Sequence, residues 1–210
     1  MTEWISLQFI LDLTFTIKKG NGADLLAADS VAFLSNPVSS LFLDAELIIG
    51  GITVEGLTQS WGPVGVLKAL IGVPATAAKT YARDAFKLIP DQPGQSQAAT
   101  SILNSGFASR ALLTADSAYT SVIAPLPFDL SQSSLAVPNN THLSIRLTHQ
   151  TNPERLQSNL VTANYILDIS SISLMVTYLT LSEHASSTLQ SRLSANQLSF
   201  PYLRLRCRQY

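Results

Sequence analysis

The sequence predicts an all-β fold in which antiparallel strands form a sandwich and short helices lie in the connections. Three observations favour this class: long stretches alternate apolar and polar residues, a Gly-Gly pair separates two apolar runs, and helical periodicity is confined to short segments between strand-like ones. Many strands separated by turn residues are typical of sandwiches and barrels. With helical excursions between the strands, the prediction becomes an antiparallel jelly-roll β-sandwich. A chain of 210 residues is long enough to bury one substantial core.

The first strand is predicted over residues 5–17. The odd-numbered residues there are large and apolar, and most of the even-numbered ones are polar: Ile5, Leu7, Phe9, Leu11, Leu13, Phe15 and Ile17 against Ser6, Gln8, Asp12, Thr14 and Thr16. A period of two sustained over this length indicates a strand with one buried face. The polar sequence Lys-Lys-Gly-Asn-Gly at residues 18–22 ends the strand as a turn.

A β-hairpin is predicted over residues 41–55, where Gly50 and Gly51 separate two apolar runs. A type I′ turn needs positive φ at both central residues, which glycine tolerates. A helix through this stretch would instead lose about 1 kcal/mol at each glycine. Pro37 precedes the first strand of the hairpin, and Ile48 within the apolar run is predicted to be buried.

Two helices are predicted after the hairpin. In residues 63–70 the period changes, Pro63 suits the first helical position, and Val64, Leu67 and Ile71 share one face. A second helix is predicted over residues 76–86, with Thr76 as its N-cap.

Residues 89–118 combine prolines and glycines with many Ser, Gln and Ala, and they predict a long excursion loop at the surface. The aliphatic and aromatic run at 119–130 then predicts a strand. Pro125 and Pro127 would bend that strand or place it at a sheet edge. Residues 142–149 alternate again and predict a further strand.

Residues 165–181 form a long β-rich run in which the odd-numbered and the even-numbered residues are both partly apolar, as in a strand covered on both sides.

A short helix is predicted over 183–193 and a final strand over 203–208. The final strand places three arginines on one face: Arg204, Arg206 and Arg208. These arginines could contact nucleic acid or an acidic neighbouring subunit. The alternative is a charged edge strand that blocks improper strand pairing.

The composition is poor in charge, with 13% charged residues where about 25% is usual. Hydroxyl side chains supply the polarity instead, with 26 Ser and 17 Thr. Such a surface predicts that part of it is covered by other subunits, and an ordinary Ser/Thr-rich sandwich is the alternative. The net charge of −1 leaves no overall field that would steer the chain to nucleic acid or membrane.

A single cysteine, Cys207, excludes an internal disulfide framework and a cysteine-based zinc site, and it favours assembly inside a cell. The first residues, Met-Thr-Glu-Trp, lack the basic region that opens a signal peptide. No apolar stretch reaches the length of about 18 residues that a transmembrane helix needs, so none is expected.

The order of four segments along the chain is informative. They are Pro37-Val38-Ser39-Ser40-Leu41-Phe42, the hairpin Ala45–Val54, Leu143-Ser144-Ile145-Arg146-Leu147, and Tyr165–Val176. This order resembles the hexon-like major capsid proteins of Maverick/Polinton-type elements and related large DNA viruses, over residues 10–182. Proteins of that family carry two jelly rolls in one chain, and this chain has room for about one.

The resemblance implies a structural capsid subunit that assembles as a homotrimer within a virion shell, together with other capsid proteins, inside the cytoplasm or nucleus of a host cell. Residues 1–182 would form the jelly-roll domain, with the excursion loop at 89–118. Residues 183–210 would add a C-terminal helix and strand, and could open a second jelly roll. The alternative from another class is a monomeric β-sandwich module that binds carbohydrate or protein, with Trp61 or Tyr119 as an aromatic platform.

The sequence shows no catalytic, cofactor or metal motif. His142, His149 and His184 do not have the spacing of metal ligands. Residues 20–22, Gly-Asn-Gly, begin like a dinucleotide fingerprint, but residue 25 is Leu where the third glycine belongs. Neither a nucleophile elbow nor a Walker loop is present.

Asp168 and Glu183 could form an acid pair only if folding brought them together, and nothing in the sequence does so. We therefore expect a protein without enzymatic activity, cofactor or metal.

Overall fold

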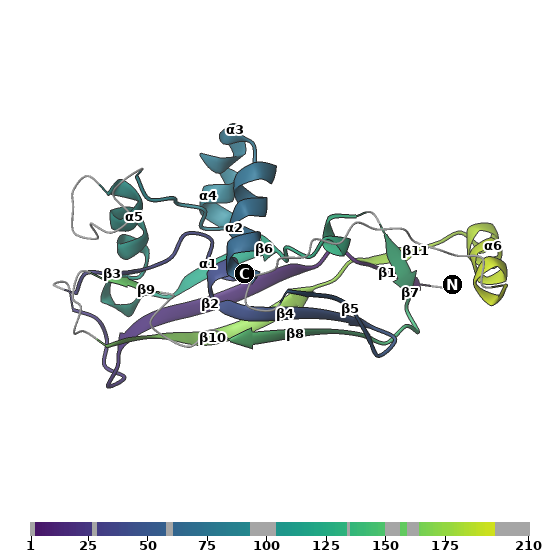
Figure 1. Cartoon of the computed structure of the whole chain (residues 1–210), viewed down its shortest axis with the longest axis horizontal. Helices are drawn as coiled ribbons and strands as arrows, with labels where there is room; N and C mark the ends of the chain where they lie inside the picture. The colour runs from purple at the N-terminus through teal and green to yellow at the C-terminus, as the bar shows by residue number, and fades with distance from the viewer. Residues whose placement is uncertain are drawn as a thin grey trace, which may run out of the picture.

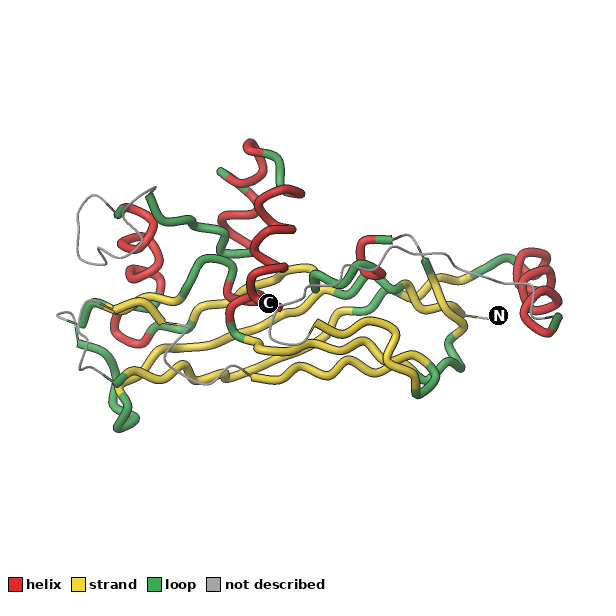
Figure 2. Tube along the Cα trace, viewed as in Figure 1, coloured by secondary structure: helices red, strands yellow, loops and turns green. Residues whose placement is uncertain are grey.

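The computed structural model describes residues 3–26, 29–57, 61–92, 104–133, 135–149, 156–158 and 164–195. Within these ranges the molecule is elongated, and its main strands run along the long axis (Figure 1). The helices of the central part of the chain stand on one side of the strands (Figure 2).

The strands are β1 (Glu3–Ser6), β2 (Ile10–Lys19), β3 (Val31–Phe33), β4 (Phe42–Ile49), β5 (Ile52–Leu57), β6 (Thr120–Pro125), β7 (Ala136–Pro138), β8 (Leu143–His149), β9 (Leu156–Ser158), β10 (Tyr165–Met175) and β11 (Tyr178–Thr180). The helices are α1 (Pro37–Ser40), α2 (Trp61–Gly72), α3 (Ala75–Ala78), α4 (Tyr81–Ala85), α5 (Ser105–Leu113) and α6 (Glu183–Ser194), with 3₁₀ turns at Ala115–Ser117 and Leu130–Gln132.

The strand pairing is nested. β1 pairs with β11, β2 with β10, β3 with β9 and β4 with β8, and all four pairs are antiparallel. The chain therefore forms a long two-armed ribbon, and a ribbon of this kind wound into two facing sheets is a jelly roll. The other strands extend it: β5 joins β4, β6 joins β2 and β7 joins β1. The predicted antiparallel jelly-roll fold with short helices in the connections is confirmed.

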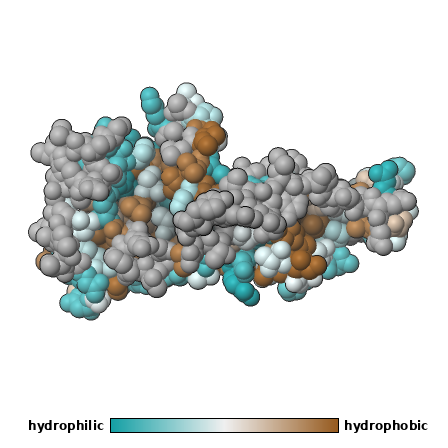
Figure 3. Space-filling view, viewed as in Figure 1, coloured by the Kyte–Doolittle hydropathy of each residue, from teal (hydrophilic) through white to brown (hydrophobic). Residues whose placement is uncertain are grey.

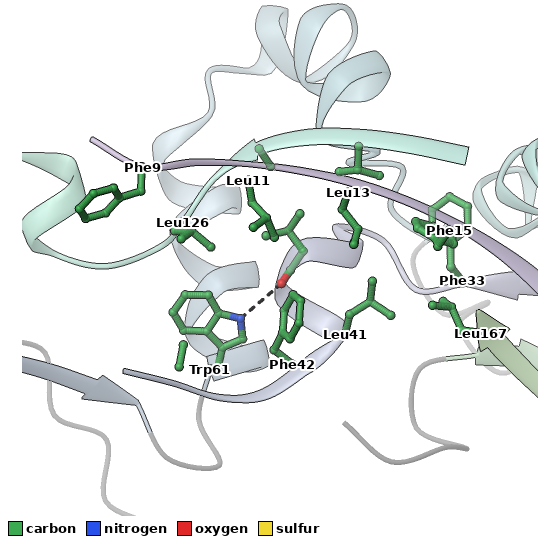
Figure 4. Close-up of a cluster of buried hydrophobic side chains, with 14 of the residues drawn as sticks. Phe9, Leu11, Leu13, Phe15, Phe33, Leu41, Phe42, Trp61, Leu126 and Leu167 are labelled. Carbon is green, nitrogen blue, oxygen red and sulfur yellow. Dashed lines mark hydrogen bonds between the residues drawn. The ribbon is translucent and has the colours of Figure 1, made fainter. Parts of the chain in front are cut away.

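The core lies between the sheet β10-β2-β6 and the sheet β5-β4-β8. The predicted inner face of residues 5–17 is confirmed, because every odd-numbered residue in that range is buried: Ile5, Leu7, Phe9, Leu11, Leu13, Phe15 and Ile17. Figure 4 shows the β2 side chains facing Leu41, Phe42 and Trp61 from the opposite side of the core. The single predicted strand is divided, since β1 ends at Ser6 and β2 begins at Ile10.

The hairpin of β4 and β5 is confirmed, with φ of 60° at Gly50 and 82° at Gly51. Leu47 is fully buried, whereas Ile48 is only partly buried. The expectation that Ile48 belongs to the core is wrong, because successive strand residues point to opposite faces and Leu47 occupies the inner one.

Helix α2 begins at Trp61, two positions before the predicted start. Of the three residues predicted to share one face of this helix, Val64 is 2% exposed, but Leu67 is 56% and Ile71 is 85% exposed. The helix leaves the sandwich as it proceeds, so its second half projects from the molecule (Figure 1). The predicted helix at 76–86 is divided into α3 and α4, and Pro74 rather than Thr76 is the N-cap of α3.

The region 89–118, predicted as an excursion loop, contains α5. Phe107 and Arg110 of this helix are buried against the strands, and the side chain of Asn104 caps it by accepting a hydrogen bond from the Phe107 N–H at 3.2 Å. Residues 93–103 lie outside the described residues. At least the second half of this region is therefore a packed part of the domain.

β10 carries a β-bulge between Ile169 and Ser171. Leu167 and Ile169 precede the bulge and pair with Ile17 and Phe15 on the inner face of β2. After the bulge, Ile172 and Leu174 pair with Leu13 and Leu11, which lie on the same inner face of β2, so they occupy the same face of the sheet as Leu167 and Ile169. The extra residue of a bulge shifts the alternation by one. β10 thus has one apolar face, and the expectation of a strand covered on both faces is wrong.

The remaining predictions hold within the described residues. β6 ends at Pro125 and forms an edge of its sheet, as the prolines suggested. β8 directs Leu143, Ile145 and Leu147 to the core. The predicted helix at 183–193 is α6. None of the helices in the described ranges has the length and hydrophobicity needed to cross a membrane.

Candidate interaction surfaces

A buried arginine fastens α5 to the sandwich. Arg110 is 0% exposed, and its Nε donates to the carbonyl of Phe33 at 2.7 Å. Its Nη2 donates to Asp91 Oδ1 at 2.6 Å and to Gln157 Oε1 at 2.9 Å, and its Nη1 donates to the carbonyl of Ile89. The guanidinium therefore joins β3, β9, α5 and the segment before it, which is a structural role.

Close backbone packing supports the same junction. A Cβ added at Gly106 would lie 2.1 Å from the carbonyl oxygen of Pro90, so the first turn of α5 can approach this segment only with glycine there. Sequence reasoning missed Arg110. The available signal was that no other charged residue stands between Asp91 and Asp116.

A second buried polar cluster links β5 to α2. Glu55 is 1% exposed and accepts hydrogen bonds from the backbone N–H groups of Asp129 at 2.7 Å and Leu130 at 3.2 Å. Lys68 of α2 donates to Asp129 Oδ1 at 2.5 Å and to the carbonyl of Pro127 at 2.6 Å. Burial raises the pKa of Glu55 despite the two N–H donors, which act in the opposite direction.

These polar clusters do not form a catalytic constellation. No group of three or more potential metal ligands occurs within the described residues. His142 lies in the turn before β8, His149 ends β8 and His184 lies in the first turn of α6. Residues 20–22 form the predicted turn, with φ of 84° at Gly22.

Asp168 and Glu183, the possible acid pair, are not paired with each other. The partner of Asp168 is Lys18 on the neighbouring strand, at 3.3 Å, while Glu183 lies in the first turn of α6.

The two residues considered as aromatic platforms for a binding module differ in exposure. Tyr119 is 70% exposed, but Trp61 is fully buried and donates from Nε1 to the carbonyl of Val38 at 3.3 Å, so Trp61 cannot act as a platform.

The projecting half of α2 is an exposed apolar surface, and Figure 3 shows hydrophobic surface along it. Leu67 and Ile71 are its exposed large residues. Lys68 is the one charged residue of α2, and its ammonium group is turned inward to Asp129 and Pro127. A helix that is apolar on all sides is normally buried against a partner.

Two hollows border these helices. One, of about 420 Å³, lies between the α2–α4 helices and α5, with Lys79 and Arg83 among its lining residues. The other, of about 630 Å³, lies between Trp4 of β1, the turn after β7, and α6. The arginines Arg204, Arg206 and Arg208 lie outside the described residues.

A second exposed apolar surface follows the end of β10 and continues into β11. Its large hydrophobic residues are between 38% and 58% exposed: Ile172, Leu174, Met175, Tyr178 and Leu179. In the described structure β10 forms one edge of the sheet β10-β2-β6, and β11 forms one edge of the sheet β11-β1-β7.

Comparison with known proteins gives similarity at the level of structure. No family model matches the chain, and no curated protein matches it. The crystal structure of the mavirus major capsid protein is similar to 87% of this chain, with 15% sequence identity and a TM-score of 0.49. VP54 of PBCV-1, fitted into a reconstruction of the virophage Sputnik, is similar to 90% of the chain, with 14% identity and a TM-score of 0.41.

The PBCV-1 virus capsid model is similar to 93% of the chain, with 15% identity and a TM-score of 0.35. This chain spans only 38% to 42% of the length of these three proteins. The mavirus protein and the PBCV-1 capsid belong to the group that the sequence motifs of this chain resemble. The assignment of the fold itself rests on the nested strand pairing.

Proposed function

We propose that this chain is a structural, non-enzymatic subunit of a viral capsid, in which a hexon-like jelly roll associates with other copies as a homotrimer in the virion. The observation that carries the proposal is the combination of a nested jelly-roll ribbon with a projecting apolar helix. Leu67 and Ile71 are largely exposed on that helix, and its one charge is turned inward. An apolar helix in this position is suited to burial between subunits.

The proposed mechanism is lateral association. Charged residues make up only 13% of the chain, so neighbouring subunits can meet without desolvating many charges. Each contact can be weak, because many symmetric contacts add up in a closed shell. Residues 183–210 would then lead toward a second jelly roll in a longer polypeptide.

The experiment that tests this proposal is a measurement of solution mass by light scattering across a range of concentrations. We expect trimers or larger assemblies, and we expect the double substitution Leu67→Ser with Ile71→Ser to reduce the assembled fraction. Leu112→Ser is the matched control, because Leu112 is 77% exposed on the separate helix α5. A strictly monomeric chain at all concentrations would contradict the proposal and favour a monomeric binding module.

We further propose that Arg204, Arg206 and Arg208 contact nucleic acid or an acidic neighbouring subunit. Replacing all three with Gln should leave the subunit folded and weaken assembly or nucleic-acid retention in a salt-dependent manner, because such contacts are ionic. Assembly yield at two salt concentrations is the measurement. Aggregation without a salt-sensitive defect in assembly would indicate instead that these arginines guard an edge strand.

A further inference from the structure

From Ile169 onward, the outer edge of β10 lacks the features that normally keep a sheet edge from pairing. Edge strands are usually protected by charges, prolines or short length. β6, the opposite edge of the same sheet, ends at Pro125, and β8, an edge of the facing sheet, carries Arg146. β10 is 11 residues long, and residues 169–182 contain neither a charged residue nor a proline.

The bulge in β10 gives this edge a defined apolar face. Ile172 and Leu174 lie on the inner face with Leu13 and Leu11, yet they are 50% and 38% exposed. Ser171, Ser173 and Met175 point to the other face, because they pair with Thr14, Asp12 and Ile10 of β2. An added strand that supplied apolar residues beside Ile172 and Leu174 would therefore extend the core of the sandwich.

We propose that β10 is a docking edge for β10 of a second copy of this chain. The two strands would pair antiparallel about a two-fold axis at Ser173, so that Ile172 lies opposite Leu174 of the partner copy and Leu174 opposite its Ile172. The same register places Ser171 opposite Met175 of the other copy. In this register all facing residues share a face, as antiparallel pairing requires.

Charge and symmetry select this occupant. No charged residue from one copy would face a like charge from the other, because 169–182 is uncharged. A two-fold contact uses the same patch on both subunits, and the Ile172–Leu174 pair is complementary to itself when reversed. The pairing would join two three-stranded sheets into one continuous sheet. This inference needs only a second copy, so it does not depend on the proposed trimer.

Cysteine cross-linking of the full chain tests the register. In a Cys207→Ser background, Ser173→Cys should form a cross-linked dimer under mild oxidation or with a short thiol-reactive linker. Facing residues of an antiparallel pair have Cα atoms about 4.5–5.5 Å apart, within disulfide range. Ser171→Cys is the matched control, since it points to the same face. Its symmetry mate would lie four residues along the strand, about 14 Å away.

We expect Ser173→Cys to cross-link at least about five times more than Ser171→Cys, because only the former lies on the axis. Adding Leu174→Lys should lower the cross-linked yield by a similar factor, because it sets a charge against Ile172 of the partner copy. Leu174 is already partly exposed, so thermal unfolding should show that this variant remains folded. Equal cross-linking at the two positions, no cross-linking, or yields unchanged by Leu174→Lys would each overturn the proposal.

Discussion

Leu11 and Leu174 face each other across the pairing of β2 and β10, yet one is 2% exposed and the other 38%. The two residues are identical and share one face of one sheet. They differ in position, because among the described strands β2 has a neighbour on each side whereas β10 has a neighbour on one side. The comparison shows that alternation determines which face of a strand is apolar, while the arrangement of neighbouring strands determines how completely that face is covered.

The same contrast separates the two ends of β10. At its beginning, Tyr165 and Leu167 are each 7% exposed. This end lies beside β3, β9 and α5, which close the sandwich there (Figure 1). Phe33 of β3 packs edge-on against Phe15 of β2, with ring centroids 5.4 Å apart. The far end of β10 has no such covering element among the described residues.

The largest effect is expected for Leu11→Ala. Leu11 belongs to the fully packed side of the pair, so the substitution leaves a cavity and should lower the free energy of unfolding by about 3 kcal/mol. Urea denaturation measures the effect. A loss below about 1 kcal/mol would show that the core around β2 is loosely packed and would remove the contrast with β10.

The closed end should open if its buried arginine is removed. Arg110→Met keeps an apolar stem but leaves the carbonyls of Phe33 and Ile89 and the Asp91 carboxylate without their donor. We expect a smaller loss than for Leu11→Ala, of about 2 kcal/mol in the free energy of unfolding. Hydrogen exchange should rise in β3 and β9 more than in β4.

Arg83→Met is the control for this prediction, because Arg83 is exposed on α4 and its replacement should change stability by less than about 0.5 kcal/mol. Equal effects of the two substitutions would show that the guanidinium of Arg110 does not hold this end together.

The pH dependence of stability tests the buried carboxyl group. Burial raises the folded-state pKa of Glu55 above its ordinary value of 4.5, so the folded state holds the proton more tightly than the unfolded state. The stabilisation is complete below the ordinary pKa and is lost as the pH rises through the raised folded-state value. Wild-type melting temperature should therefore fall relative to Glu55→Gln as the pH is raised from 4 upward. A parallel pH profile for both proteins would contradict this assignment.

Sequence patterning predicted the elements that depend on local chemistry. The period of two identified the buried face of residues 5–17, and Gly50 and Gly51 identified the hairpin turn, because both features are set by neighbouring residues. The bulge at Ser170 was missed because it reverses the alternation within one strand. If the alternation of residues 165–181 continued without a bulge, Ile172 and Leu174 would lie on the face opposite to Leu167 and Ile169, which is why two apolar faces were predicted.

The candidate surfaces were harder to predict, since they depend on contacts between distant segments. Arg110 bonds to residues as far away as Phe33, and no local pattern records that contact. Helical periodicity placed Leu67 and Ile71 on one face of the helix together with Val64. The pattern could not show that α2 leaves the sandwich before those residues are reached.

The smallest effect is expected for Leu174→Ala, the partner substitution to Leu11→Ala. The same three carbons are removed, but part of the Leu174 side chain already contacts water, so less transfer free energy is lost and no closed cavity forms. We expect a loss of no more than about 1 kcal/mol in the free energy of unfolding. Urea denaturation in dilute protein, where pairing between copies is weak, measures the stability loss of the single chain.

Repeating the urea denaturation at high protein concentration separates the two roles of this edge, because a contact between copies stabilises the folded state by mass action. A cost that grows with concentration for Leu174→Ala but not for Leu11→Ala would connect the uncovered end of β10 to association. A cost for Leu174→Ala as large as that for Leu11→Ala in dilute protein would show that the end of β10 is covered within the single chain.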